Sequence, residues 1–374
     1  EGLPNLYSRE CYAAVRRRLA PGGLLCQWIQ GYRVSSSTLQ SLLATCLSSF
    51  DHALVWETIP GVDYLVVASD DPIRLDLAEA SRRMAEPALA AELAPLGIRS
   101  AADLLRGHLC GRRPALDWCG AATIQTDDGN WLGYQSPRDL YERVPDAGVL
   151  AAANRLRLPI EPDLLRGVGE GDLDRIAAAR KARGLVLDAS AAQAAGEAEA
   201  AFPLLVEALD LSPDDPVVRA RVERLASGLR QSARSLAEAG DPAGSAAALA
   251  RLAKLTPGDW KVHFNLGTIL ASIGRHGDAL AAYLEANRLA PEDLDVLLNL
   301  GNTYGRLGDA GSAAAIYGAI LQRAPRHAEA LYNLGLYHEG RGERRQAAEL
   351  YRRALDASPA DPDFRAALRR VGQE

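Results

Sequence analysis

The chain reads Phe264-Asn-Leu-Gly267, then Leu298-Asn-Leu-Gly301, then Tyr332-Asn-Leu-Gly335, so one pattern returns every 34 residues (positions 267, 301 and 335) within residues 260–361. An alanine, a tyrosine and a proline follow each copy at the same interval. These are Ala279, Tyr283 and Pro291, then Ala313, Tyr317 and Pro325, then Ala347, Tyr351 and Pro359. A fixed period of this length indicates one small structural unit written three times, not a single globular core.

This pattern resembles the tetratricopeptide repeat, in which each unit is a pair of antiparallel helices. Small residues such as Gly267 and Ala279 fall where the two helices must approach closely, and large residues such as Tyr283 fill the space between them. Gly274 is expected to end the first helix, and Pro291 follows the end of the second. Since one unit cannot bury its apolar face alone, we expect neighbouring units to stack into an all-α solenoid.

The repeat extends over residues 226–361, followed by an amphipathic capping helix at residues 362–374. Stepping back 34 residues from Gly274 and Pro291 leads to Gly240 and Pro257, which marks a degenerate unit before the clear ones. Residues 158–225 are Ala-rich and are predicted to form a helical linker with one further degenerate unit. A polar-backed terminal helix is what a solenoid needs to cover its last apolar face.

A row of asparagines is the candidate binding feature of the repeats, because Asn265, Asn299 and Asn333 recur at equivalent positions of the first helix. An asparagine amide offers one acceptor and two donors, so it can pair with both the carbonyl and the N–H of a bound peptide backbone. The neighbouring residues Phe264, Leu298 and Tyr332 would then supply selectivity. The alternative is that these asparagines serve only local hydrogen bonding within the repeat.

The composition excludes several classes of function. A net charge of −6 and a pI near 5.7 argue against a general affinity for nucleic acid or for an anionic membrane surface. Since no run of about 18 apolar residues occurs, we predict no membrane span. The 5 cysteines are odd in number and lack CxxC spacing, which favours a reducing, cytoplasmic location. His108, Cys110 and Cys119 match no zinc-ligand spacing, so we predict no metal site.

Residues 1–70 show a different pattern from the repeats. We predict a helix over residues 8–19 with Ser8 as its N-cap, a strand buried on both faces over residues 24–29, a helix over residues 37–50, and an antiparallel hairpin of residues 53–59 and 63–69. Helix, strand, helix and closing hairpin form the second half of a doubly wound α/β domain. A loop at Glu1 runs straight into the first helix, so we expect this chain to be the rear portion of a longer protein.

The runs Leu6-Tyr-Ser-Arg-Glu-Cys-Tyr12 and Leu19-Ala-Pro-Gly-Gly-Leu-Leu-Cys-Gln-Trp28, followed by Thr58-Ile-Pro60, resemble the C-terminal half of spermidine synthases. The resemblance implies a partial methyltransferase-like domain and, for the parent protein, aminopropyl transfer from decarboxylated S-adenosylmethionine to putrescine. The family's glycine-rich nucleoside loop and catalytic aspartate have no counterpart in these residues. We therefore expect no bound cofactor and no turnover from the 374 residues themselves. Gln27 aligns with a glutamine near the family's active site, and Tyr64 is a candidate for its substrate tyrosine.

Residues 71–157 are expected to form a helical extension that contains a Thr-Asp-Asp segment. Thr126-Asp127-Asp128, followed by Tyr134, Pro137 and Arg138, is similar to a segment of fused spermidine synthase-like proteins. Asp127 and Asp128 are candidates for holding a polyamine ammonium, because opposite charges attract in a partly desolvated cleft. The alternative is a polar turn before Gly129.

Two functions therefore remain open. The first is a spermidine synthase-like enzyme that carries a protein-binding solenoid and is tethered to a membrane, if at all, through segments outside these residues. The second is a non-catalytic scaffold with a remnant methyltransferase-like domain. A protein or peptide in the repeat groove is the expected partner in both cases.

Overall fold

The computed structural model describes residues 4–31, 34–59, 62–129 and 154–372 of the chain. The chain divides into two compact units, residues 1–223 and 224–374.

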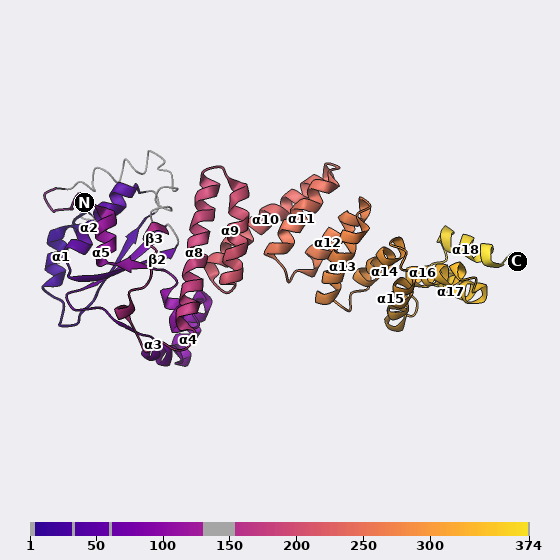
Figure 1. The fold of residues 1–374 in the computed structure, drawn as a ribbon, viewed down its shortest axis with the longest axis horizontal. Helices are drawn as coiled ribbons and strands as arrows, with labels where there is room; N and C mark the ends of the chain where they lie inside the picture. Colours follow the sequence, from indigo (N-terminus) through magenta and orange to yellow (C-terminus); the bar gives the residue numbers. More distant parts are fainter. Residues whose placement is uncertain (1–3, 32–33, 60–61, 130–153, 373–374) are drawn as a thin grey trace. The chain divides into compact units, whose positions relative to one another are not determined.

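A four-stranded sheet forms the centre of the first unit (Figure 1). Its strands are β1 (Leu25–Gln30), β2 (His52–Ile59), β3 (Asp63–Ser69) and β5 (His108–Gly111). Their order is β1-β3-β2-β5, and each neighbouring pair is antiparallel. The predicted hairpin is confirmed, since Val55 of β2 lies opposite Val66 of β3. The parallel sheet of a doubly wound domain is not found in the described residues of this sheet.

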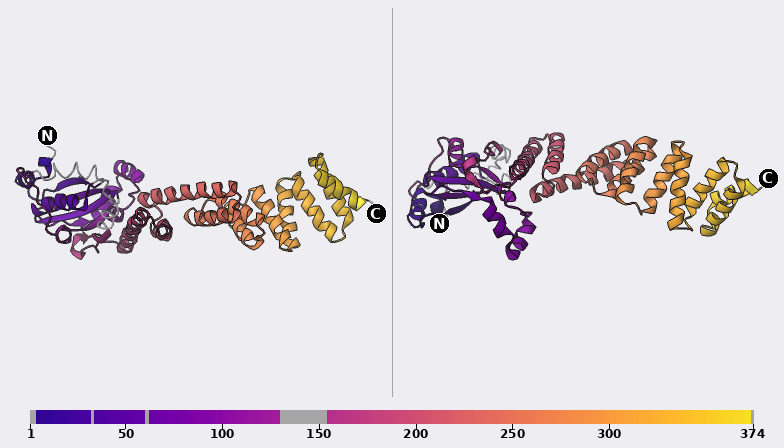
Figure 2. Two further views of the ribbon diagram at one scale, coloured as in Figure 1. Left: turned by 90° about the horizontal axis from the view of Figure 1, so that it is seen from above. Right: turned by 60° about the horizontal axis from the view of Figure 1, so that its bottom comes forward.

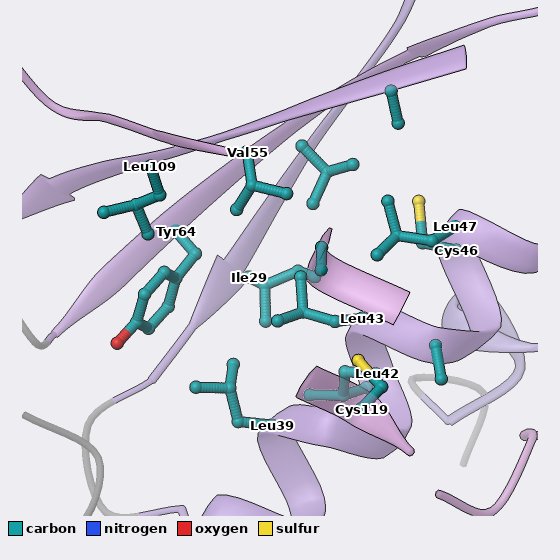
Figure 3. Close-up of a cluster of buried hydrophobic side chains, with 14 of the residues drawn as sticks. Ile29, Leu39, Leu42, Leu43, Cys46, Leu47, Val55, Tyr64, Leu109 and Cys119 are labelled. Atoms are coloured by element: carbon teal, nitrogen blue, oxygen red, sulfur yellow. The ribbon is translucent and has the colours of Figure 1, made fainter. Parts of the chain in front are cut away.

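One face of the sheet is covered by helices α1 (Arg9–Arg16), α2 (Ser36–Ser48) and α5 (Arg112–Cys119). Ser8 caps α1 as predicted, because its hydroxyl accepts a hydrogen bond from the amide of Cys11 at 3.1 Å. Leu39, Leu43 and Leu47 of α2 recur at helical spacing and point toward Val55 and other sheet residues in a closed apolar core (Figure 3).

Strand β1 corrects the expectation of a strand buried on both faces. Along β1 burial alternates, so Ile29 is fully buried whereas the Trp28 side chain is 48% exposed. The physical reason is that the core of α1, α2 and α5 packs against one face of β1, while side chains on its other face, such as Trp28, remain exposed. A continuous apolar run in sequence does not by itself separate these two cases.

The opposite face of the sheet is covered in part by short elements between residues 75 and 105, as the sequence predicts for a helical segment. These are β4 (Leu75–Asp76), α3 (Leu77–Met84), α4 (Pro87–Leu93) and the 3-10 helices η2 (Ala94–Leu96) and η3 (Ala101–Leu105). Strand β5, which was not predicted, returns the chain to the sheet. The divisions at residues 70 and 157 stay predictions, but the sheet continues past residue 70 with β5, and its core continues past residue 157 with Leu187.

The remaining elements of the first unit are mainly helical. The 3-10 helix η1 (Pro4–Tyr7) precedes α1. The 3-10 helix η4 (Pro162–Leu164) and the short strand β6 (Leu165–Arg166) follow α5, and β6 pairs in parallel with β4. Helices α8 (Asp172–Ala194) and α9 (Ala198–Leu211) then pack against each other. They occupy the region where the degenerate unit of the linker was predicted. Helix α10 (Pro216–Glu238) begins in the first unit and ends in the second.

The second unit consists of successive helix pairs (Figure 2). After α10, its helices are α11 (Pro242–Leu255), α12 (Trp260–Ser272), α13 (His276–Leu289), α14 (Leu294–Arg306), α15 (Ala310–Arg323), α16 (Ala328–Gly340), α17 (Arg344–Ala357) and α18 (Pro362–Gly372). The turn between α12 and α13 contains Gly274, whose φ of 78° favours glycine. The predicted register therefore gives the observed helix boundaries.

Candidate functional site

The first helix of each clear repeat touches the second through a glycine and a tyrosine. A Cβ atom added to Gly267, Gly301 or Gly335 would lie 2.8, 2.7 or 2.5 Å from a ring carbon of Tyr283, Tyr317 or Tyr351. Contacts this short do not occur in packed proteins, so only glycine lets the ring lie flat against the helix. The expected close approach is thus found in all three units.

The hydroxyl of each tyrosine reaches back to the first helix of its own repeat. Tyr283 donates to Thr268 at 3.1 Å, and Tyr317 donates to Asn302 at 2.7 Å. The equivalent position in the third repeat is Leu336, which has no acceptor, and Tyr351 donates instead to Glu339 at 2.6 Å. A half-buried hydroxyl costs free energy when it has no partner, which explains why the partner changes while the bond persists.

The predicted asparagine row differs from one repeat to the next. Asn265 is exposed, and its amide has no hydrogen-bond partner among the residues that the structure describes. The amide nitrogen of Asn299 donates to the carbonyl oxygen of Asp295 in its own helix at 2.9 Å. The amide nitrogen of Asn333 donates to Asn302 of the preceding repeat at 2.8 Å. The sequence therefore places three equivalent amides, but two of them already use a donor.

The three neighbours expected to give selectivity lie mostly in the core. Leu298 is only 9% exposed and packs in the cluster of α14, α15 and α16. Phe264 is half-buried, with its ring centroid 5.8 Å from that of Tyr283, and Tyr332 lies 4.9 Å from Phe364 of the capping helix. Leu298 offers almost no surface to a bound peptide, so selectivity from this position is not supported.

The N-terminal candidates Gln27 and Tyr64 share the sheet face that packs on α2. Gln27 lies opposite Val66, and the next inward residue of β1, Ile29, lies opposite Tyr64. The amide nitrogen of Gln27 donates to the carbonyl oxygen of Trp28 at 2.8 Å. Tyr64 is 1% exposed, and its hydroxyl has no hydrogen-bond partner in the described residues. Burial raises the pKa of Tyr64, so the phenol stays protonated.

Asp127 and Asp128 lie in an exposed turn and not on the sheet. Gly129 closes this turn by donating to the Thr126 hydroxyl at 3.0 Å, and the amide of Asp127 donates to Glu10 of α1 at 3.0 Å. These contacts are those of a polar turn beside α1. Tyr134, Pro137 and Arg138, which follow in the predicted segment, lie outside the described residues.

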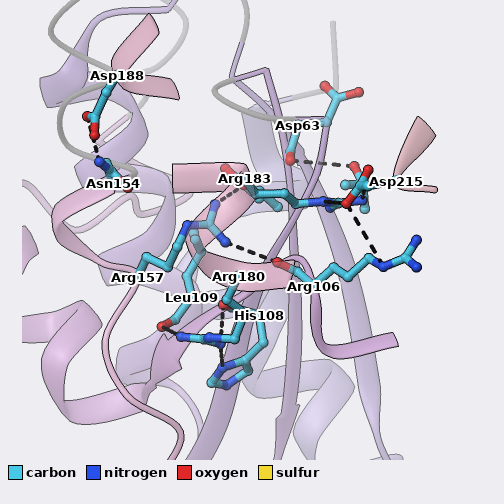
Figure 4. A network of polar contacts seen from close by, with 12 residues as sticks. Asp63, Arg106, His108, Leu109, Asn154, Arg157, Arg180, Arg183, Asp188 and Asp215 are labelled. Carbon is cyan, nitrogen blue, oxygen red and sulfur yellow. Dashed lines mark hydrogen bonds and ion pairs between the residues drawn. The ribbon is translucent and has the colours of Figure 1, made fainter. Parts of the chain in front are cut away.

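A buried network of arginines, which no sequence pattern marks, joins α8 and the turn before α10 to the sheet (Figure 4). Arg157 pairs with Glu57 of β2, and both side chains are almost fully buried. Arg183 of α8 donates to Asp215 at 2.9 Å, while the other oxygen of Asp215 accepts from the amide of Val217 at 2.9 Å. Each buried carboxylate therefore has a cationic partner, as the cost of desolvation demands.

His108 belongs to the same network. Its Nδ1 atom lies 2.8 Å from a guanidinium nitrogen of Arg180, and its ring meets that of Trp56 edge to face at 5.1 Å. Burial, together with the charges of Arg180 and Arg157, lowers the pKa of His108 to about 3. The imidazole is therefore neutral and accepts a hydrogen bond from Arg180. No periodicity marks such residues in a sequence, because each comes from a different element.

The comparisons with known proteins concern the second unit. A family model described as tetratricopeptide repeat matches residues 230–293 and 298–362. Among solved structures, MamA (residue 41 to the end) from Desulfovibrio magneticus RS-1 is 21% identical with a TM-score of 0.38, covering 40% of this chain and 84% of MamA. YrrB, titled a TPR protein with an unusual peptide-binding site, is 17% identical with a TM-score of 0.35, covering 51% and 91%.

A third solved structure is the first TPR of Spaghetti (RPAP3) bound to the HSP90 peptide SRMEEVD. It is 18% identical with a TM-score of 0.30, covering 30% of this chain and 90% of that one. No curated protein sequence matches the chain. Together with the observed helix pairs, the family match shows that tetratricopeptide repeats occupy residues 230–362.

Two further properties of the described residues bear on function. No helix in them is long and apolar enough to cross a membrane. They also contain no group of three or more His, Cys, Asp or Glu side chains placed to hold a metal ion. Cys110 and Cys119, which follow His108 in sequence, are buried thiols whose pKa values are raised to about 12 by desolvation.

Proposed function

We propose that the repeats at residues 230–362 bind an extended peptide segment of a partner protein, so that this part of the chain is a protein-interaction module. The observation that carries the proposal is the exposed amide of Asn265, which has no partner within the described part of the chain. Its Oδ1 accepts, and its Nδ2 donates, which matches the N–H and the carbonyl of one residue in an extended peptide, because both groups point to the same side.

The other two asparagines take a narrower role in this proposal. Asn299 and Asn333 each use one of their two N–H groups, on Asp295 and Asn302, so each keeps its Oδ1 and one N–H for a peptide. The row then provides a fully available amide at Asn265, followed at 34-residue intervals by two amides that each keep one acceptor and one donor. Leu336, which is 39% exposed one turn after Asn333, is the apolar side chain best placed to contact a ligand side chain.

A peptide selected on the full chain from a random library displayed on phage tests this proposal. Its affinity is measured by fluorescence polarisation for the parent and for the Asn265→Ala, Asn299→Ala and Asn333→Ala variants. A neutral hydrogen bond is worth little net of solvation, so each change is expected to weaken binding by roughly two- to tenfold, most at Asn265. The Gln322→Ala variant, which removes an exposed amide from α15, is the matched control.

Methylation of the peptide backbone nitrogens separates this mechanism from side-chain recognition. An N-methylated copy of the selected peptide keeps every side chain but loses the donors that the asparagine oxygens accept. We expect it to bind at least tenfold more weakly. Equal affinity of the two peptides, or equal affinity of parent and Asn265→Ala, would show that the asparagines serve only the repeat itself.

A spermidine synthase-like origin of the first unit is a second proposal. The order α1, β1, α2, β2 and β3 supports it, as does the placement of Gln27 and Tyr64 on one sheet face. Calorimetric titration of the full chain with putrescine or decarboxylated S-adenosylmethionine tests it. Saturable heat that the Gln27→Ala and Tyr64→Phe variants remove would support a retained substrate site, with Asp127→Asn and Asp128→Asn testing a role for the turn. Absence of binding favours the scaffold.

A further inference from the structure

The first unit contains a hollow that neither the repeats nor the predicted site residues use. It has a volume of about 740 Å³ and lies between the sheet face opposite α2 and the elements of residues 74–107. Trp56 of β2 and Leu65 and Val67 of β3 line its sheet side, and Leu77 and Leu105 line the other. The hollow is partly open to solvent, so a ligand can enter it without unfolding of the unit.

The hollow has the properties of a small-molecule site. Ligand pockets typically enclose roughly 300–1,000 Å³ and combine an apolar lining with a few polar groups. Leu96 and Leu104, which also line this hollow, are 61% and 42% exposed. A ligand that covers these exposed apolar side chains removes them from water, and this burial favours binding.

The charged groups around the hollow indicate which ligand fits. Glu57, Glu79 and Asp103 pair with Arg157, Arg82 and Arg106. Asp76 caps α3 by accepting from the amide of Glu79 at 2.9 Å.

The arginines that line the hollow fall into two groups. Arg106 and Arg183 are engaged by Asp103 and Asp215. Arg74 and Arg83 are exposed, line the same hollow, and have no carboxylate partner among the described residues. Arg74 and Arg83 therefore leave two guanidinium groups free to bind an anion.

We propose that this hollow binds an amphipathic carboxylate, with its alkyl chain against Leu65, Val67 and Leu77 and its carboxylate held by Arg74 and Arg83. Ala80 and Arg83 lie about one helical turn apart on α3, so an apolar side chain and a guanidinium face the hollow from the same side of this helix. A guanidinium is suited to this task because it stays charged and presents several donors to a carboxylate.

Calorimetric titration of the full chain with decanoate, decanol and decylamine, each below its micelle concentration, tests the proposal. We expect decanoate to bind once per chain and more tightly than the neutral alcohol or the amine. The Arg74→Gln/Arg83→Gln double variant should weaken decanoate by about tenfold, because exposed ion pairs each contribute modestly, and should leave decanol unchanged. Arg113→Gln, which changes an exposed arginine of α5 outside the lining, is the matched control.

Filling the hollow tests the place of binding. Val67→Trp from the sheet and Leu104→Trp from the mouth should each weaken both decanoate and decanol by more than tenfold while the circular dichroism spectrum stays that of the parent. Leu104 is partly exposed, so its variant keeps the test valid if Val67→Trp fails to fold. The proposal is overturned if decylamine binds more tightly than decanoate, if both tryptophan variants retain parental affinity, or if no saturable binding occurs.

Discussion

Gly301 and Gly305 lie one helical turn apart on α14, but their surroundings are opposite. A Cβ atom at Gly301 would lie 2.7 Å from the Tyr317 ring, whereas one at Gly305 would meet nothing within 4 Å. The Tyr317 hydroxyl is held by Asn302, so the ring has no room to withdraw. The same substitution at the two sites therefore separates the steric contact from the general cost of glycine in a helix.

We predict that Gly301→Ala destabilises the second unit by about 1–2 kcal/mol through overpacking, and that Gly301→Leu costs more. Gly305→Ala should instead stabilise it by about 0.5–1 kcal/mol, because alanine is the better helix former. Urea unfolding followed by circular dichroism measures both. A stabilising Gly301→Ala would contradict the proposed register of the repeat.

His108 links pH to the stability of the first unit. Its pKa is lowered to about 3 in the folded chain, against about 6.5 in an unfolded one. Between these values the unfolded chain binds the proton and the folded chain does not, so the free energy of unfolding falls as pH falls from about 6.5 toward 3. The contribution is fully present above pH 6.5.

We predict that His108 alone removes about 2 kcal/mol of stability from the first unit between pH 6.5 and pH 5. The His108→Gln variant should show a correspondingly smaller loss over the same range, whatever its stability at pH 7. Tryptophan fluorescence in a Trp260→Phe background measures this, since the other four tryptophans precede residue 224. Parallel pH profiles of parent and variant would contradict the assignment.

At the scale of elements, the sequence predicted what local periodicity and small residues encode. The repeat helices, their glycine turns and the β2–β3 hairpin follow from spacing alone. It did not predict β5, because His108-Leu-Cys-Gly111 is short and carries no alternation, and its pairing with β2 depends on tertiary contact. Nor did it predict the arginine network or the apolar hollow, whose residues come from separate elements and meet only after folding.

The packing of the capping helix α18 on the last repeat can be tested by substitution. Phe364 is 4% exposed against Tyr332, and Arg370 pairs with Glu339 of α16 at 2.5 Å. Phe364→Ala should cost about 3–5 kcal/mol through the cavity it leaves. Hydrogen exchange should show the loss first in α16 and α17, because neighbouring repeats share their stability. Arg369→Ala, on the exposed side of α18, should leave exchange unchanged; equal effects of the two variants would show that α18 is not packed on the last repeat.

At the scale of the whole molecule, each unit has a hydrophobic core of its own. The core of the first unit is built on the sheet and α2, while that of the second is divided into clusters shared by successive repeats. A single unfolding free energy does not describe a chain with two such cores. Substitutions at Gly301 and His108 therefore perturb the two units separately.

We predict two unfolding transitions for the full chain in scanning calorimetry. Gly301→Ala should lower the midpoint of one transition, and a change from pH 6.5 to pH 5 should lower the other through His108. Because the pH-dependent group lies in the sheet unit and the glycine lies in the repeats, combining the two perturbations should give the sum of their separate shifts. A single transition that both perturbations move would show that the chain unfolds as one cooperative unit.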